Sequence, residues 1–300
     1  MAVELMLRLK NRAMDNYDIE MWRYARELKQ KSADKILGHE HIRPGQAVLQ
    51  NVTIRINKQG LRGGPIRDPA PKRRILFLGS SVTLGWGVPE KEVLTSRIQK
   101  LFEKDGQDVE VLNAGIGNYN TERYVHRYLT RLKDLNPTDI VVHYFVNDVE
   151  ILKSGGGNIL LRNSQTAVMI WSVLSRYMRP TGEANLVKYY RKMYQPDSPG
   201  YKKMRSSLVK LADYAKANNQ RIYLAMTPDV RNLVNYKLGF IHAIMKKLAK
   251  ELGFIYIDLL PPMEGKTPKE LWAMPGDPHP NSEGHKIMAK SIYAVLSESH

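Results

Sequence analysis

The chain has 300 residues, of which 43% are hydrophobic, and it contains no cysteine. A chain of this length can bury a full apolar core, and the lack of cysteine excludes disulfide bridges and thiolate metal ligands. Lysine and arginine outnumber aspartate and glutamate by 46 to 30, an excess that attracts phosphates, acidic glycans or an acidic membrane surface. No helix-turn-helix, zinc-finger or RNA-binding signature accompanies this charge, so we predict no nucleic-acid partner.

The first ten residues mix apolar and charged side chains, unlike the uninterrupted apolar centre of a secretory signal. No apolar run approaches the ~20 residues that cross a bilayer. We therefore expect a cytoplasmic protein, although a chain trimmed of an export signal would look the same. Leucines alternate with Arg8, Lys10 and Arg12, so the alternative that the first dozen residues lie on a membrane surface stays open.

Residues 1–71 differ in texture from the rest of the chain. Helix-like periodicity runs through residues 1 to about 45, and residues 51–58 then alternate polar with β-branched side chains before a Gln59-Gly60 turn. A Gly- and Pro-rich linker follows at 63–71. These patterns predict an N-terminal appendage of helix and strand over 1–71 and a main domain over 72–300.

In the main domain, short apolar runs alternate with longer amphipathic stretches, the pattern of a parallel sheet covered by helices on both faces. We predict strands at 74–78, 109–112, 140–145, 221–225 and 254–258, and helices at 91–104, 121–135, 201–218 and 238–252. Sheets of this kind bind ligands at the carboxyl ends of their strands. Polar residues just beyond those ends are therefore the candidates for a site.

An insertion at 151–205 separates the third predicted strand from the fourth. It contains Gly155-Gly156-Gly157, an apolar stretch at 167–178, and a basic run with Tyr189, Tyr190 and Tyr194. It is too long for a simple crossover, so it is interpreted either as a lid or substrate platform or as an ordinary extra helical layer.

The first predicted strand is followed by Gly79-Ser80-Ser81, which puts a hydroxyl group at the carboxyl edge of the sheet. Alone, this pattern is also typical of a turn with a helix cap. A phosphate-binding loop is the other interpretation, but the glycine motifs of such loops are missing here.

The next two predicted strands also end in hydrogen-bond donors. Residues 113–121 supply flexible backbone with Gly117 and Asn118, and Asn147-Asp148 supplies a side-chain amide. Each segment alone is more typical of a turn or a helix cap. Their coincidence at one sheet edge favours a pocket that stabilises an oxyanion.

Near the carboxyl terminus, Asp277-Pro278-His279-Pro280 holds a histidine between two prolines with a carboxylate two residues earlier. Such a histidine can accept a hydroxyl proton while the carboxylate orients it. The rival interpretation is a metal site of Asp277, His279 and His285, but the chain offers no other obvious cluster to complete the ligand set.

Together, these four segments resemble the blocks of the SGNH (GDSL) serine hydrolases, in the same order, over about residues 72–296. The resemblance implies a flavodoxin-like three-layer α/β/α fold, with Ser81 as the nucleophile. Ser80 stands where the family usually has aspartate, and the last block is one residue shorter than usual between Asp277 and His279.

The resemblance further implies that His279 is the base, that Asp277 orients it, and that Asn147 with Gly117 or Asn118 binds the oxyanion. Neither a metal nor an organic cofactor is expected. The family leads us to expect an esterase or acylhydrolase that cleaves or transfers an O-acyl group, and the basic, tyrosine-rich insertion favours O-acetyl groups on a glycan. The alternatives are a lipid esterase or thioesterase, or an inactive glycan-binding module.

Overall fold

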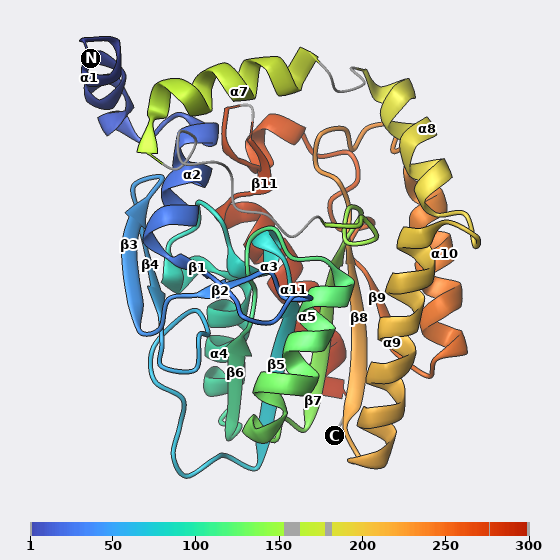
Figure 1. Cartoon of the computed structure of the whole chain (residues 1–300). Helices are drawn as coiled ribbons and strands as arrows, with labels where there is room; N and C mark the ends of the chain where they lie inside the picture. Colours follow the sequence, from blue (N-terminus) through green and yellow to red (C-terminus); the bar gives the residue numbers. More distant parts are fainter. Residues whose placement is uncertain (1, 153–162, 178–181, 276, 299–300) are drawn as a thin grey trace.

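The computed structural model describes residues 2–152, 163–177, 182–275 and 277–298, and its centre is a five-stranded parallel sheet in the order β6-β5-β7-β8-β9 (Figure 1). The strands are β5 (Arg73–Gly79), β6 (Val109–Asn113), β7 (Asp139–Phe145), β8 (Arg221–Thr227) and β9 (Ile255–Asp258). Each lies within two residues of its predicted range. The predicted flavodoxin-like sheet is therefore confirmed.

Helices cover both faces of this sheet. One face is covered by α5 (Thr121–Arg127), α9 (Pro199–Ala217) and α10 (Gly239–Glu251), and the other by α4 (Leu94–Lys104) and α11 (Ser282–Glu298). Strand β5, which lies between β6 and β7, shows why helices are needed on both faces. Its side chains alternate, with Leu76 and Leu78 in one apolar cluster and Ile75 and Phe77 in the other.

The helix predicted at 121–135 changes its hydrogen-bonding pattern along its length. The α-helix α5 ends at Arg127, a π-helical turn runs through Tyr128–Leu132, and a 3₁₀ turn follows at Lys133–Leu135. Asn136 then takes a left-handed conformation with φ of 48° and ends the segment.

The N-terminal segment contains helices α1 (Ala2–Lys10) and α2 (Tyr17–Glu27) and two antiparallel hairpins. The hairpins are β1 (Lys29–Lys31) with β2 (His39–His41), and β3 (Gly45–Leu49) with β4 (Val52–Ile56). The strand predicted at 51–58 is thus present as β4. Helical structure to residue 45 is wrong beyond residue 27, because the Asp34 carboxylate accepts the N–H groups of Ile36 and Leu37 and closes a turn there.

This segment packs directly on the main domain. Apolar side chains from α2 and the β3–β4 hairpin are buried against Leu84 and Trp86, which follow β5 in the chain. They are Tyr24, Leu28, Ala47, Leu49, Ile54 and Ile56. The backbone N–H of Arg62 also donates to the Asn113 carbonyl at the end of β6, at 2.9 Å. The segment therefore reaches the carboxyl edge of the sheet.

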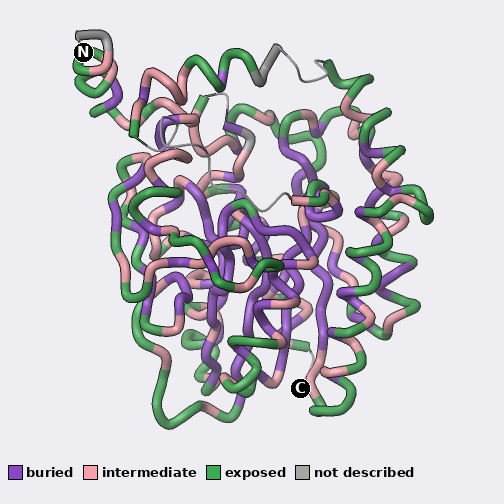
Figure 2. Tube along the Cα trace, in the orientation of Figure 1, coloured by how far each residue is buried: buried purple, intermediate pink, exposed green. Residues whose placement is uncertain are grey.

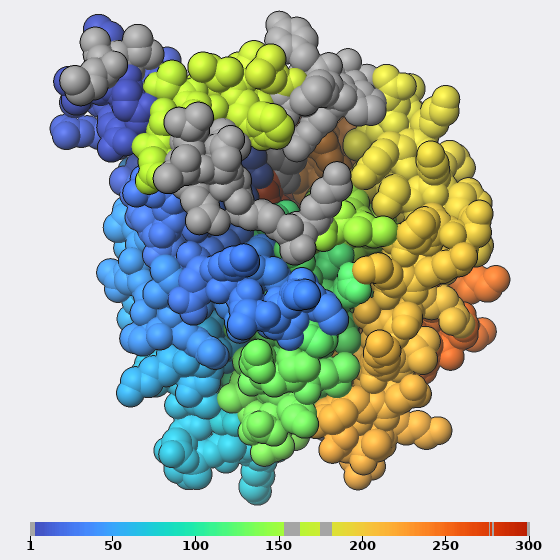
Figure 3. Space-filling model, in the orientation of Figure 1, coloured from blue at the N-terminus to red at the C-terminus, as the bar shows by residue number. Residues whose placement is uncertain are grey.

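The insertion contributes helices α7 (Gln165–Tyr177) and α8 (Glu183–Met193), while Gly155, Gly156 and Gly157 lie outside the described residues. Helix α7 contacts α1 and α2, and its atoms adjoin those of the N-terminal segment in Figure 3. None of the described helices is long and apolar enough to cross a membrane.

Candidate active site

Ser81 begins the short helix α3 (Ser81–Leu84), directly after strand β5. A Cβ atom on Gly79 would lie 1.9 Å from Thr83 Oγ1 and 2.7 Å from the His143 carbonyl oxygen, so only glycine fits at the turn. Ser80 is 4% exposed, whereas Ser81 is partly open to solvent. Of the two adjacent serines, Ser81 is therefore the one that a substrate can reach.

His279 lies on strand β11 (Asp277–Pro280), which pairs with β10 (Trp272–Met274). The register of Trp272 opposite Pro280 shows that this segment forms a two-stranded antiparallel sheet with β10, separate from the main sheet. The hairpin holds His279 Nε2 at 2.7 Å from Ser81 Oγ. It therefore brings the predicted base to the predicted nucleophile across 198 residues of sequence.

Asp277 completes a chain of hydrogen bonds. Its Oδ1 accepts from His279 Nδ1 at 2.5 Å and from the His279 backbone N–H at 3.0 Å, and the residue is fully buried. With Nδ1–H directed at a carboxylate, Nε2 is left to accept the proton of Ser81. One intervening residue is thus enough for Asp277 and His279 to meet.

His285 occupies a different environment. It lies in α11, is fully buried, and its Nδ1 accepts the backbone N–H of Leu94 at 3.1 Å. Burial lowers the pKa of His285 well below its ordinary value. In the described ranges, no group of three or more His, Asp or Glu side chains is arranged to hold a metal ion, and Asp277, His279 and His285 form no such group.

The segment after β6 is held in place from two sides. Asn113 donates from Nδ2 to the Thr83 carbonyl at 2.7 Å, and its Oδ1 accepts the N–H of Gly115 at 3.0 Å. A Cβ atom on Gly115 would lie 2.2 Å from the Leu84 nitrogen, so glycine allows the loop to approach α3 closely. These contacts bring residues 113–118 beside the helix that begins at Ser81.

The N–H groups of Gly117 and Asn118 differ in availability. Gly117 N–H donates to the Tyr24 hydroxyl at 3.0 Å, and the Gly117 carbonyl accepts from Lys29 Nζ at 2.7 Å and His39 Nε2 at 3.1 Å. Asn118 is exposed and has a φ of 63°, a conformation that glycine adopts most easily. The geometry therefore favours Asn118 over Gly117 as an oxyanion donor.

Asn147 and Asp148 follow β7, and the two side chains have opposite surroundings. Asn147 is exposed, whereas Asp148 is 1% exposed and its Oδ2 accepts the Phe145 N–H at 3.1 Å. Burial raises the pKa of Asp148 to about 8, against the opposing effect of hydrogen bonds from Phe145 and Ser80. The Asp148 carboxyl group is thus buried directly after the residue whose amide we expect at the oxyanion.

Three contacts of the N-terminal segment with this site were not predicted from the sequence. Gln50 Nε2 donates to Asp277 Oδ2 at 3.2 Å, the Tyr17 ring stacks on His279 with centroids 6.0 Å apart, and Tyr24 binds Gly117. No local motif marks these residues, because each meets its partner only when the segment folds back over the main domain.

The insertion was predicted to offer tyrosines to a substrate, and the structure corrects this for two of them. Tyr190 and Tyr194 are each 3% exposed, and the Tyr194 hydroxyl lies 2.7 Å from that of Tyr144 and donates to the Val146 carbonyl at 2.8 Å. They anchor α8 to the end of β7. Tyr189, at 40% exposed, remains accessible.

A serine at the carboxyl edge of a parallel sheet, joined by hydrogen bonds to a histidine and a buried aspartate, is the arrangement found in serine hydrolases. The sequence matches the GDSL-like lipase/acylhydrolase family over residues 77–287, so the chain belongs to that family and is an ester-cleaving hydrolase. A search of curated proteins finds no match.

Solved structures share the fold at low sequence identity. An α/β hydrolase, LAE5, from the metagenome of Lake Arreo, Spain, is 14% identical with a TM-score of 0.52, over 76% of this chain and 96% of that one. A catalytic mutant of the acetylxylan esterase Axe2 from Geobacillus stearothermophilus is 14% identical with a TM-score of 0.50, over 74% of this chain and 93% of that one.

Proposed function

We propose that the protein hydrolyses or transfers an O-acyl group, most simply O-acetyl, on a carbohydrate. The observation that carries the chemistry is the hydrogen-bonded chain from Ser81 through His279 to Asp277. Ser81 Oγ attacks the ester carbonyl while His279 accepts its proton, and His279 then protonates the departing alcohol. Water, activated by the same imidazole, releases the acyl group from Ser81.

The oxyanion formed in each step is stabilised by the backbone N–H groups of Ser81 and Asn118 and by the side-chain amide of Asn147. Preorganised donors of this kind supply much of the rate enhancement of acyl transfer. No metal or organic cofactor takes part in this proposal, since the three side chains account for every proton that moves.

Support for a carbohydrate comes from a cavity formed partly by the loop after β8. It has a volume of about 380 Å³ and lies between α8 and the loop after β8, where Asp229, Arg231 and Tyr236 face apolar side chains such as Leu186. Trp272 Nε1 donates to the Val230 carbonyl at 3.1 Å, which joins this loop to the hairpin that carries His279. Polar groups beside apolar surface suit a sugar ring, and Axe2, which shares the fold, is an acetylxylan esterase.

A lipid ester is the second candidate substrate. Helix α7 exposes Ile170, Trp171, Val173 and Leu174, and α1 beside it exposes Leu5, Met6 and Leu9. Together with Arg8, Lys10 and Arg12, this surface would suit an acyl chain or peripheral contact with an anionic membrane.

The test of the chemistry compares Ser81→Ala with Ser80→Ala. We expect Ser81→Ala to abolish hydrolysis of a short-chain aryl ester and labelling by a fluorophosphonate, while Ser80→Ala keeps most of both. Activity that survives in Ser81→Ala would remove Ser81 as the nucleophile.

The test of the substrate compares aryl esters of increasing chain length with acetate release from acetylated glycans at two ionic strengths. We expect short chains to be preferred and acetate release from an anionic glycan to fall as salt rises. A preference for chains of about eight carbons or more would favour the lipid substrate, because each buried methylene contributes about 0.8 kcal/mol.

A further inference from the structure

Asp277 Oδ2, the carboxylate oxygen that does not bind His279, has a hydrogen-bond partner outside the predicted site. This partner also lies outside residues 77–287, which match the family. Asp277 is fully buried, and its Oδ1 is used by His279. Its Oδ2 accepts a hydrogen bond from Gln50 Nε2 at 3.2 Å. Among the described residues, Gln50 is the only hydrogen-bond donor to this oxygen. Burying a carboxylate oxygen without a hydrogen-bond donor costs free energy, so the Gln50 amide stabilises the buried Asp277 carboxylate.

The backbone of Gln50 is held by a specific structure. Gln50 and Asn51 form the two-residue turn between β3 and β4, and both have positive φ, 50° and 59°. Such turns favour glycine, asparagine and aspartate, so a glutamine at the first position is uncommon. Its N–H donates to Oε2 of Glu20 at 2.7 Å, and Glu20 is itself fully buried.

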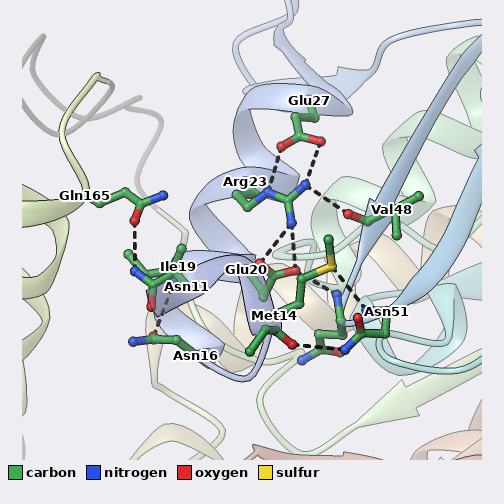
Figure 4. A network of polar contacts seen from close by, with 12 residues as sticks. Asn11, Met14, Asn16, Ile19, Glu20, Arg23, Glu27, Val48, Asn51 and Gln165 are labelled. Carbon is green, nitrogen blue, oxygen red and sulfur yellow. Dashed lines mark hydrogen bonds and ion pairs between the residues drawn. The ribbon is translucent and has the colours of Figure 1, made fainter. Parts of the chain in front are cut away.

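The network that holds this turn extends through the N-terminal segment (Figure 4). Arg23 pairs with Glu20 at 3.1 Å and donates to the Val48 carbonyl at 3.0 Å, and Asn51 Nδ2 donates to the Ala13 carbonyl at 3.1 Å. The turn is thus fastened to α2 on one side and to the chain before α2 on the other. These contacts fix the turn that places Gln50 beside Asp277.

The main domain leaves room for the Gln50 side chain. A Cβ atom on Gly87 would lie 2.4 Å from Gln50 Oε1, so a larger residue there would displace the amide. Oε1 is buried without a hydrogen-bond partner among the described atoms, while Nε2 contacts Asp277 and the sulfur of Met274. The opposite orientation of the amide would place an oxygen against a carboxylate, so Asp277 dictates this one.

From this geometry we infer that Gln50 is a positioning residue for the reaction. Its Nε2–H holds the carboxylate of Asp277 so that Oδ1 stays aligned with His279 Nδ1. The inference rests on the proposed role of Asp277 as the residue that orients the base. The N-terminal segment thereby becomes part of the active site, and Tyr17, stacked on His279, contacts the base from the same segment.

The first experiment replaces Gln50 by methionine, which keeps the length of the side chain but removes the donor. Gln46→Met is the matched control, because Gln46 lies exposed on strand β3 of the same hairpin. On a short-chain aryl ester, we expect Gln50→Met to lower kcat by about tenfold or more and to change KM less than about twofold. This is the pattern expected of a residue that orients a catalytic side chain without touching the substrate. Gln46→Met should match the wild type in both.

The second experiment uses Gln50→Glu, whose effect should depend on pH. When protonated, the introduced carboxyl group can donate to Asp277 Oδ2, whereas when ionised it repels the carboxylate. We expect the ratio of kcat/KM, variant over wild type, to fall by about fivefold or more between pH 5.5 and pH 8.5. The corresponding ratio for Gln50→Met should not change with pH. If the loss of activity were purely structural, the ratio would be independent of pH for both variants.

The third measurement is a double-mutant cycle with Asp277→Ala. If Gln50 acts through Asp277, adding Gln50→Met to Asp277→Ala should change the residual rate less than about twofold. Full activity of a folded Gln50→Met, a pH-independent ratio for Gln50→Glu, or additive losses in the cycle would each overturn the inference. Failure of the proposed function is seen separately, as a wild-type protein that neither cleaves esters nor takes up a fluorophosphonate at Ser81.

Discussion

The N-terminal segment and helix α7 both flank the carboxyl edge of the sheet, yet they present opposite surfaces. Tyr24, Leu28, Leu49, Ile54 and Ile56 of the N-terminal segment are each at most 2% exposed. On α7, by contrast, Ile170, Trp171, Val173 and Leu174 are between 48% and 58% exposed (Figure 2). Helix α2 and the β3–β4 hairpin of the N-terminal segment are thus part of the core, whereas α7, like α1, exposes apolar side chains.

The attachments of α7 are mainly polar. Glu4 accepts the backbone N–H groups of Gln165 and Thr166 at 3.0 and 2.9 Å, and Asn11 donates to the Gln165 side chain at 2.8 Å. Burial by itself would raise the pKa of Glu4, but the hydrogen bonds from Thr166 and Gln165 hold this pKa below its usual range. Caps of this kind fix where a helix begins without burying its outer face. Changes in the N-terminal segment should therefore alter both folding and catalysis, whereas changes on α7 should alter substrate choice.

The largest effect that would test this comparison is expected from Tyr24→Ala. It removes a fully buried ring packed on Trp86 and the hydroxyl that binds Gly117, so we expect the free energy of unfolding to fall by about 3–5 kcal/mol, with a loss of activity. Denaturant unfolding measures the change. Tyr24→Phe is the matched control and should cost about 1–3 kcal/mol, because it leaves the Gly117 N–H and His41 without that partner. A stable, active Tyr24→Ala would show that the segment is dispensable.

Asn147→Ala should separate catalysis from stability at the same edge. Because Asn147 is exposed, its loss should leave the unfolding free energy within about 0.5 kcal/mol of the wild type. Turnover should nevertheless fall by about 10²–10³, since one oxyanion donor is removed. Asn118→Gly, which keeps the backbone N–H and suits the positive φ, serves as the control and should retain activity. Unchanged turnover in Asn147→Ala would exclude its amide from the oxyanion site.

Asp148→Asn should reveal the buried acid through the pH dependence of stability. The folded protein keeps the Asp148 proton up to a pKa of about 8, whereas the unfolded chain releases it near the ordinary value of 3.8. The stability contributed by this group is therefore complete below about pH 4 and lost as pH rises toward 8, with a slope of at most about 1.4 kcal/mol per pH unit. Thermal unfolding from pH 5 to pH 8 should show a smaller decline for Asp148→Asn than for the wild type. Parallel declines would mean that Asp148 is already ionised in the folded protein.

Trp171→Ala is expected to have the smallest effect on folding. Trp171 is 54% exposed, so its replacement should change the unfolding free energy by less than about 0.5 kcal/mol. Its effect should appear in KM for long-chain aryl esters and not for acetyl esters, if α7 contacts an acyl chain. Val234→Ala, at an apolar position 74% exposed in the loop after β8, is the control. A destabilised Trp171→Ala would place α7 with the core and remove the contrast.

Much of the main domain follows from the sequence because its signals are local. The alternation of short apolar runs with amphipathic helices predicts all five strands of the sheet, and the prolines and carboxylate around His279 predict a restrained base. The order of the four polar segments predicts that Ser81, Asn147 and one of Gly117 and Asn118 share one edge. Such inferences are possible from the sequence because strand periodicity and chain direction are properties of neighbouring residues.

The tertiary structure alone decided how that edge is supported. Gln50 meets Asp277 across 227 residues, and its only local mark is a turn that glutamine rarely occupies. The Tyr24 hydroxyl accepts the N–H of Gly117, whereas the sequence alone could not rank Gly117 against Asn118 as an oxyanion donor. Likewise, Tyr190 and Tyr194 are buried and anchor α8, whereas the sequence alone could not separate buried tyrosines from exposed ones. The reason is physical: a polar or aromatic side chain chooses its partner by the surface that folding brings against it, and that surface is set by residues far away in the chain.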